Sequence, residues 1–171
     1  MRSQRTNAII SILFVVFGGP AFVLVYVPWW LTRFRLPHNE PYWQRALALA
    51  VIALGIVPVL ESAARFVRVG KGTLVPTAAP ERLVVGGLYR YVRNPMYAGV
   101  TVCLAAEVML FRSSALAWEL ALALIAMNLF VRLYEERKLS RRYGEAYAEF
   151  KRNVPRWLPR LSPWSGTRSQ P

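Results

Sequence analysis

The chain has 171 residues, 55% of them hydrophobic, yet it carries 22 Lys and Arg against nine acids, for a net charge of +13. Its length fits a single domain spanning residues 1–171, and apolar runs alternating with basic blocks favour a membrane protein over a nucleic-acid binder, whose basic patch belongs on a water-soluble fold. The chain has one His, one Cys and no Asp, which excludes a His-based metal cluster, a Ser-His-Asp triad and an intrachain disulfide. We therefore expect no metal ligand, and from the apolar and basic pattern we expect no nucleic-acid partner.

Two apolar runs come first in the chain. Residues 8–31 follow two arginines and are long enough to span a bilayer, too long for the core of a signal peptide, and broken only by glycines and prolines. They predict a retained, kinked membrane helix. Residues 43–60 predict a second span, and Glu61, Arg65 and Arg68 continue it at helical spacing as a polar stripe on a helix that leaves the membrane.

Two further apolar runs form a predicted hairpin. Residues 69–94 precede it as a long connection rich in glycine and proline, in which residues 83–85 are a candidate short extended piece, and connections this long are usually functional. Residues 95–111 and 115–131 then predict a third and a fourth span, separated by only three residues. Cys103 lies within the third run, where we expect a buried small residue.

The remainder of the chain predicts one amphipathic helix. Apolar residues recur near helical spacing among many basic ones, a pattern typical of a helix lying on the membrane surface: Leu139, Tyr143, Phe150 and Val154. Two prolines, Pro155 and Pro159, end it, and residues 163–171 are expected to form a disordered tail. The expected fold is therefore all-α and integral to the membrane, with four transmembrane helices plus a C-terminal amphipathic surface helix.

The distribution of basic residues predicts the orientation. Four spans place both termini on one side, and that side receives 18 of the 22 Lys and Arg residues. Because basic loops stay in the cytoplasm, both termini and the two polar segments at residues 65–93 and from 132 onward are predicted to be cytoplasmic.

A pair of carboxylates marks the start of the final segment. Arg132, Glu135 and Glu136 fall at i, i+3 and i+4, so on an α-helix they share one face and Arg132 can pair with either glutamate. One interpretation is an exposed salt bridge at the end of a membrane helix, which contributes little. The other is a site for a charged ligand.

The segment before the third span is the second candidate. Five hydrogen-bonding side chains fall within one stretch of nine residues: Tyr89, Tyr91, Arg93, Asn94 and Tyr97. Pro95 fits the first position of the next helix, which makes Asn94 its N-cap. Each residue alone suits an interfacial aromatic belt with a helix cap, but together they suit the wall of a pocket.

Four short motifs occur in a fixed order: Gly87-Leu88-Tyr89, Arg93-Asn94-Pro95-Met96-Tyr97, Glu135-Glu136-Arg137-Lys138-Leu139 and Tyr143-Gly144. Over about residues 70–160 the chain thereby resembles the isoprenylcysteine carboxyl methyltransferase family. Asn94 stands where that family carries His, and with Tyr134-Glu135-Glu136 it also resembles the phosphatidylethanolamine N-methyltransferases of the same membrane superfamily.

The resemblance implies a membrane enzyme that uses S-adenosylmethionine (SAM) without a soluble dinucleotide-type domain. Residues carried over to cofactor binding are Tyr89, Arg93, Asn94, Pro95, Tyr97 and Glu136, and those carried over to catalysis or substrate orientation are Arg132 and Glu135. The expected function is methylation of a small or lipid-like amphiphile at the cytoplasmic face of the lipid bilayer. The alternatives are phospholipid N-methylation and a non-catalytic anchor that binds anionic lipid or a partner protein.

Two glutamates lie inside predicted spans. Glu107 and Glu119 flank the hairpin turn, with Arg112 between them. Intramembrane ionisable residues are often functional, but pairing with Arg112 or extension to the outer surface is the structural alternative, and both lie at the far end of the hairpin from the predicted site.

Overall fold

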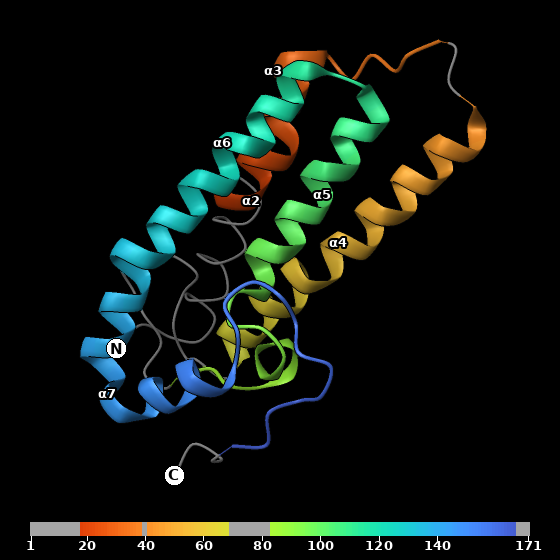
Figure 1. Ribbon diagram of the computed structural model, residues 1–171. Helices are drawn as coiled ribbons and strands as arrows, with labels where there is room; N and C mark the ends of the chain where they lie inside the picture. The colour runs from red at the N-terminus through yellow and green to blue at the C-terminus, as the bar shows by residue number, and fades with distance from the viewer. Residues whose placement is uncertain (1–17, 39–40, 69–82, 167–171) are drawn as a thin grey trace.

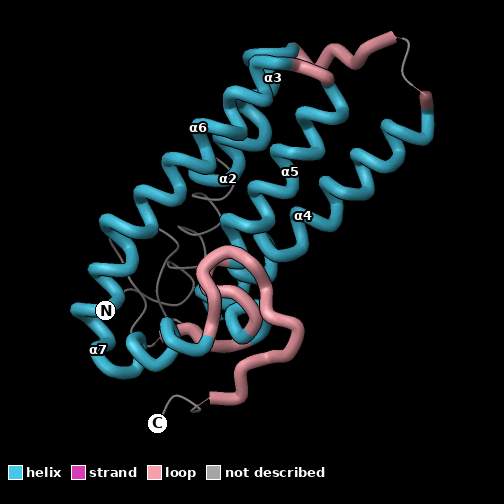
Figure 2. Tube along the Cα trace, in the orientation of Figure 1, coloured by secondary structure: helices cyan, strands magenta, loops and turns pink. Residues whose placement is uncertain are grey.

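A computed structural model describes residues 18–38, 41–68 and 83–166, and these residues form helices and loops with no strand. The all-α prediction is confirmed for this part of the chain. In Figure 1 three helices, α4 (Tyr42–Arg68), α5 (Pro95–Phe111) and α6 (Ser114–Phe130), lie side by side, and α7 (Glu136–Asn153) turns across one end of them. The tube in Figure 2 shows that the loops gather at the two ends of this bundle.

The described part of the first predicted span is helical, and it changes from α-helix to π-helix and back. It comprises α2 (Gly19–Ala21), the π-helical turn η1 (Phe22–Tyr26) and α3 (Val27–Thr32). Proline has no N–H to give to an α-helical ladder, and the wide turn lies just ahead of Pro28. The predicted irregular helix is thus present over these residues, whereas residues 8–17 of that prediction lie outside the described part.

The hairpin predicted from the sequence is confirmed nearly residue for residue. Helix α5 covers the predicted range, and α6 begins one residue earlier than expected. Arg112, in the left-handed conformation at φ 47°, ends α5, and Ser113 takes the cap position of α6. Helix α4 passes Pro58 and continues through the polar stripe to Arg68, as the sequence predicted.

Glycines let α4 and α5 approach closely. A Cβ on Gly99 would lie 2.5 Å from the carbonyl oxygen of Gly55, and a Cβ on Gly55 would lie 2.6 Å from Sγ of Cys103. Cys103 is buried as expected, with its thiol 3.5 Å from the carbonyl oxygen of Ile52. Small residues at a helix crossing are how membrane helices maximise packing contacts where lipid provides no hydrophobic drive.

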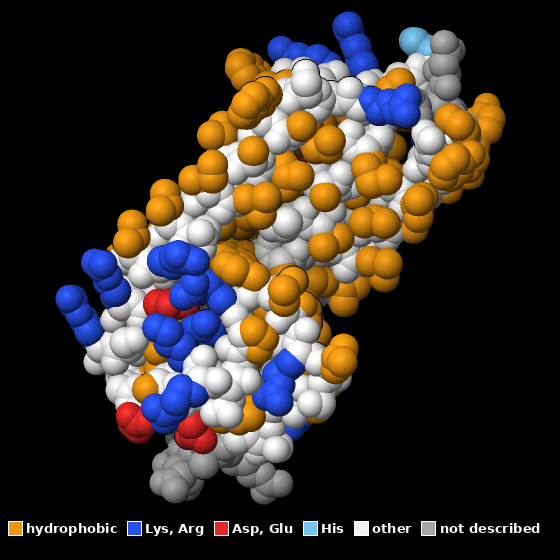
Figure 3. All heavy atoms as spheres, in the orientation of Figure 1, with side chains coloured by type: hydrophobic (Ala, Val, Ile, Leu, Met, Phe, Trp, Pro, Cys, Tyr) orange, Lys and Arg blue, Asp and Glu red, His pale blue; other side chains and the backbone are white. Residues whose placement is uncertain are grey.

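The visible face of the bundle is largely apolar, with charge at its two ends (Figure 3). Figure 3 shows hydrophobic side chains along the shaft and most of the visible basic ones near its ends. Large exposed apolar residues include Leu54, Val57, Leu60, Met109, Trp118, Leu122, Ile125 and Leu129. A soluble protein rarely exposes so continuous an apolar surface.

Two stretches, Tyr42–Arg65 and Ser114–Asn153, are long and apolar enough to cross a membrane. Helix α5 and the described part of the first run are shorter. The structure thus supports two spans by length and composition, and a count of four stays a prediction.

The amphipathic helix is present, but its apolar face does not lie on a membrane. Helix α6 continues through the π-helical turn η3 (Val131–Glu135) into α7. The apolar face of α7 packs inside the protein, in a cluster of Val84, Tyr89, Tyr147, Phe150 and Val154. Tyr147 and Phe150 are each only 3% exposed. The prediction that this apolar face lies on the membrane surface is therefore wrong. An amphipathic helix can bury its hydrophobic stripe against the rest of the protein as well as against a bilayer.

The chain beyond α7 folds back over the same end of the molecule. Trp164, which the sequence placed in a tail, packs against Phe150 with ring centroids 5.7 Å apart. Its backbone N–H donates to the carbonyl oxygen of Arg90 over 2.9 Å. Residues 167–171 of the predicted tail lie outside the described part.

Candidate functional site

A tight turn brings the first motif against α4. Gly87 opens the 3₁₀ turn η2 (Gly87–Arg90) with φ +56°, a conformation that side-chain-bearing residues rarely adopt. A Cβ at this position would also collide with the carboxylate of Glu61 and the guanidinium of Arg65. The backbone conformation therefore favours glycine here, and any larger residue would also displace the ends of the Glu61 and Arg65 side chains.

Tyr89 lies at the centre of the region. Its ring is 8% exposed and belongs to the cluster that packs under α7. Burial raises the pKa of Tyr89 strongly, opposed by its hydrogen bond with Ser62, while the nearby charges of Glu135 and Glu61 raise it further. Four elements, α4, η2, η3 and α7, thus meet around one neutral phenol.

Glu135 faces the start of α5. Burial raises the pKa of Glu135 to about 7, a hydrogen bond with the Tyr97 hydroxyl and the charge of Lys138 oppose that shift, and the Glu136 charge adds to it. Its Oε2 atom is buried and has no hydrogen-bond partner among the described residues. This carboxyl group is consequently near the midpoint of its titration at neutral pH and has one free acceptor oxygen.

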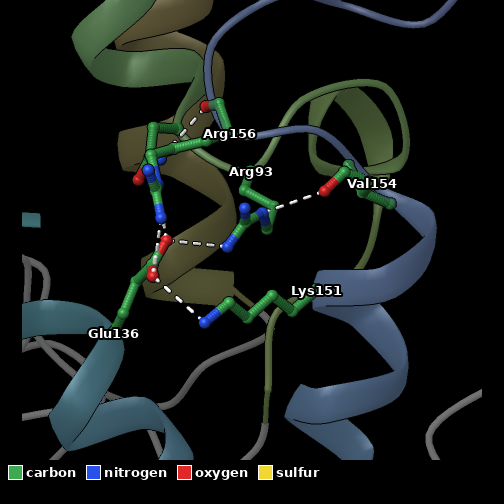
Figure 4. Close-up of polar contacts among 6 residues, drawn as sticks. Arg93, Glu136, Lys151, Val154 and Arg156 are labelled. Carbon is green, nitrogen blue, oxygen red and sulfur yellow. Dashed lines mark hydrogen bonds and ion pairs between the residues drawn. The ribbon is translucent and has the colours of Figure 1, made fainter. Parts of the chain in front are cut away.

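Glu136 has the opposite environment, shown in Figure 4. Arg93 Nη1 lies 2.8 Å from its Oε1, Arg156 donates from Nε over 2.7 Å and from Nη2 over 3.0 Å, and Lys151 Nζ is 3.5 Å from its Oε2. Burial alone would raise the pKa of Glu136, but the hydrogen bond from Arg156 and the charges of Arg93, Arg156 and Lys151 outweigh it and lower the pKa. The group is therefore a permanent anion at neutral pH.

The second motif binds the returning C-terminal chain. Arg93 donates from Nε to the carbonyl oxygen of Val154 over 2.9 Å and from its backbone N–H to that of Pro155. Asn94 donates from Nδ2 to the carbonyl oxygen of Arg156 over 3.1 Å. These residues and Glu136 therefore tie residues 154–156 to the loop ahead of α5.

Asn94 and Pro95 occupy the helix positions predicted for them. Asn94 is the N-cap residue of α5, and Pro95 follows at its start. The Asn94 side chain, however, makes no capping hydrogen bond, and its Nδ2 donates to the C-terminal segment instead.

Arg132 lies apart from the glutamates that it was predicted to join. It is exposed, and the described partners of Glu136 do not include it. The predicted common face assumed an α-helix, whereas Val131–Glu135 is a π-helical turn, which holds more residues per turn and rotates Arg132 away. Such turns often occur at functional sites.

Sequence reasoning missed several members of this region. Arg156 is the main partner of Glu136, but it follows the last motif by more than ten residues and has no local signature. Glu61 and Arg65 were noted as a helix stripe, but nothing in their spacing joins them to Gly87. Ser62 is fully buried beside Tyr89, and no sequence pattern indicated that it belongs to the site.

The region has the donor and acceptor chemistry that SAM requires. SAM carries an ammonium group and ribose hydroxyls, which need acceptors, and the buried Oε2 atoms of Glu61 and Glu135 are acceptors without a described partner. The half-buried ring of Tyr97 adds a surface that attracts a cation. Among the described residues no group of His, Cys and Glu side chains is arranged to hold a metal ion.

A basic groove lies on the outer face of η3 and α7. It has a volume of about 480 Å³ and is lined by Leu133, Tyr134, Arg137, Lys138, Arg141 and Arg142. It begins where the exposed apolar side chains of α6 end, so an apolar surface leads directly to the basic side chains of the groove.

The two glutamates of the hairpin helices α5 and α6 lie at the other end of the bundle. Glu107 is 7% exposed and near Glu119. Oε2 of Glu107 and both carboxylate oxygens of Glu119 are buried without a hydrogen-bond partner among the described residues. They take no part in the region around Tyr89.

Comparison with known proteins gives one family match. A family model described as phospholipid methyltransferase matches residues 43–146, more than half of the chain. The matched range runs from the start of α4 to the kink in α7 and contains Tyr89, Arg93, Glu135 and Glu136. It confirms the resemblance to the membrane methyltransferase superfamily. No curated protein matches the chain.

Proposed function

The chain belongs to the phospholipid methyltransferase family, and on this premise we propose that it is a SAM-dependent integral-membrane enzyme that methylates a lipid-like acceptor at the cytoplasmic face. The observation that carries the proposal is Glu135, a partly buried carboxyl group with a free oxygen between the apolar shaft and the basic end of the molecule. SAM, when bound, supplies the methyl group as an electrophile. An enzyme at this boundary can take a polar cofactor from water and an apolar acceptor from the bilayer.

In this proposal one group of residues contacts the ligands, the wall of the site, and a second group, the frame, holds the first in position. Tyr89, Tyr97 and Glu135 form the wall that contacts the cofactor and the reacting groups. Arg93 and Glu136 hold the frame through their buried ion pair. Removing one partner of a buried ion pair costs several kcal/mol, because the other charge stays buried.

Asn94 and Pro95 belong to the same frame. They fix the start of α5, and thus the position of Tyr97 in its first turn. Arg132 is exposed at the end of the apolar bundle, and in this proposal it binds the headgroup of an acceptor lipid.

The chemistry of the site favours an amine acceptor over a carboxylate. A carboxylate acceptor needs only a cation for orientation, but Arg93 and Arg156 are bonded to Glu136, and Arg65 is bonded to Glu61. An amine acceptor gains a methyl group and loses a proton, and Glu135 is placed to receive that proton. We therefore propose the amine of a phospholipid headgroup as the acceptor, with the carboxylate of an isoprenylcysteine as the second candidate.

The groove on α7 supports a phospholipid. A lipid headgroup carries a phosphate, and Arg137 and Arg141 line a groove that continues from the apolar surface of α6. Guanidinium groups bind phosphate oxygens in a bidentate geometry that suits this role.

The test is incubation of the purified protein with radiolabelled SAM and native lipids. Phospholipid N-methylation predicts base-stable label in a lipid headgroup, whereas a methyl ester gives base-labile label. The binding arm measures affinity for S-adenosylhomocysteine (SAH), which we expect to fall at least tenfold in Tyr97→Ala and Glu136→Ala. Arg152→Ala is the matched control, since Arg152 is exposed and pairs only with the exposed Glu145 among described residues. A protein that neither binds SAH nor transfers label is instead an anchor.

A further inference from the structure

An ion pair on α4 lies beneath the first motif. Arg65 approaches Oε1 of Glu61 with both Nε, at 2.7 Å, and Nη2, at 2.6 Å. Both contacts use the same carboxylate oxygen. The second oxygen, Oε2, is buried and has no hydrogen-bond partner among the described residues. An ordinary surface pair at i, i+4 would leave that oxygen in water.

The pair is in direct contact with the backbone of the motif. A Cβ on Gly86 would lie 2.6 Å from Nη1 of Arg65, and a Cβ on Gly87 would collide with both members of the pair. The charges of Glu61 and Arg65 also act on the Tyr89 hydroxyl. The pair therefore belongs to the region around Tyr89, although it comes from a helix that no motif includes.

A free, buried carboxylate oxygen is costly unless a donor reaches it. Such a group loses its hydration without compensation. The donor that best satisfies a carboxylate is a cation with N–H groups, because the resulting hydrogen bond is charge-assisted. Arg65 cannot supply this donor to Oε2, since its Nε and Nη2 are already directed at Oε1.

We propose that Glu61 binds the ammonium group of a ligand through Oε2, and that Arg65 positions the Glu61 carboxylate for this contact. The inference rests on the proposed function and assigns a binding residue to a helix outside the motifs. Two molecules in the reaction offer this chemistry: the α-ammonium of SAM and the amine headgroup of an acceptor lipid.

The experiment compares ligands with and without the ammonium. Glu61→Gln keeps the shape and an acceptor oxygen for Arg65, but it presents an amide where the free oxygen was. If the ammonium belongs to SAM, SAH binding weakens by roughly 10- to 100-fold, the size of one charge-assisted hydrogen bond. Binding of 5′-methylthioadenosine, which lacks the amino-acid part, stays unchanged. If it belongs to the acceptor, SAH affinity stays unchanged and the affinity for phosphatidylethanolamine in nanodiscs falls by the same factor.

Controls separate this inference from the proposed function. Glu145→Gln removes another ion-paired helix glutamate, at 2.7 Å from Arg152, and should leave both affinities unchanged. Unaltered SAH and lipid affinities in Glu61→Gln would overturn the inference while leaving the methyltransferase proposal intact. Failure of the wild-type protein to bind either ligand would overturn both. Should Glu61→Gln not fold, Glu61→Asp, which withdraws the carboxylate by one methylene, gives the same comparison.

Discussion

Glu135 and Glu136 are adjacent in the chain, but their carboxylates have different partners. Glu136 is held by two arginines and a lysine, while Glu135 has Tyr97 and a free oxygen. The sequence predicted both as site residues, because the pair of acids is visible as a motif. It could not separate their roles, since Arg156 comes from a segment that only the folded chain brings near.

The raised pKa of Glu135 predicts opposite effects of pH on activity and on stability. Because the pKa of Glu135 is about 7 in the folded protein, a base at this position requires loss of its proton. We expect kcat/KM to be about tenfold lower at pH 6 than at pH 8. Glu135→Gln should lower kcat/KM throughout and remove this rise, which pH–rate profiles of both proteins would measure.

Stability should change in the other direction. The folded pKa lies above the ordinary value of about 4.3, so the folded state holds the proton more tightly than the unfolded chain does. This stabilisation is complete below about pH 4 and disappears as pH rises through about 7. Melting curves should therefore show Glu135→Gln gaining a few degrees over wild type at pH 8.5 relative to pH 5. Equal pH dependence in both proteins would contradict the proposed ionisation.

At the scale of elements, local signals determined where helices begin and end. The Asn-Pro step at Asn94 and the left-handed residue Arg112 bound α5, and its range was predicted correctly. The continuation of α4 beyond its apolar run to Arg68 was also predicted, because Glu61, Arg65 and Arg68 recur at helical spacing. The face of α7 was assigned to a membrane, because an amphipathic pattern does not state whether its partner is lipid or a loop more than fifty residues earlier in the chain.

Gly144 divides α7, and its substitution tests the conformation of the last motif. Its φ of 54° and ψ of −126° are not helical, and a Cβ there would meet nothing within 4 Å. Gly144→Ala should therefore destabilise the protein by about 1–2 kcal/mol through backbone strain alone. It should also shift Tyr147 and Phe150 in their cluster.

The matched comparison is Gly99→Ala, at a helical position where space is the constraint. Its Cβ would lie 2.5 Å from a carbonyl oxygen of α4, so the two helices must separate. We expect this variant to lower the melting temperature in detergent more than Gly144→Ala does. A Gly144→Ala protein as stable as wild type would show that the kink is not required.

At the scale of the whole molecule, two regions differ in how far the sequence could predict them. The apolar bundle follows from hydropathy and turn residues, which are local. The polar end depends on contacts such as Arg93 with Val154 and Arg90 with Trp164, which join residues 61 and 74 positions apart. No periodic pattern in the sequence predicts contacts between residues so far apart. The loop ahead of α5 was therefore expected only to line a pocket, whereas part of it binds the C-terminal chain.

The orientation of this polar end is the last prediction. Because 18 of 22 basic residues belong to the side that carries Ser140, we expect this residue in the cytoplasm. His38, before α4, and Ser114, at the start of α6, should lie on the opposite side, since three predicted spans separate His38 from Ser140 and one separates Ser114 from it. All three residues are exposed in the structure, so single cysteines there can be labelled in a Cys103→Ala background.

A membrane-impermeant maleimide applied to intact cells should modify cysteines at positions 38 and 114 and spare position 140 until the membrane is opened. An N-terminal epitope tag then counts the spans: four spans place it with position 140, whereas three place it with positions 38 and 114. Labelling of position 140 in intact cells would reverse the orientation. It would also put the site around Tyr89 outside the compartment in which SAM is made, so the cytoplasmic methyltransferase proposal depends on this result.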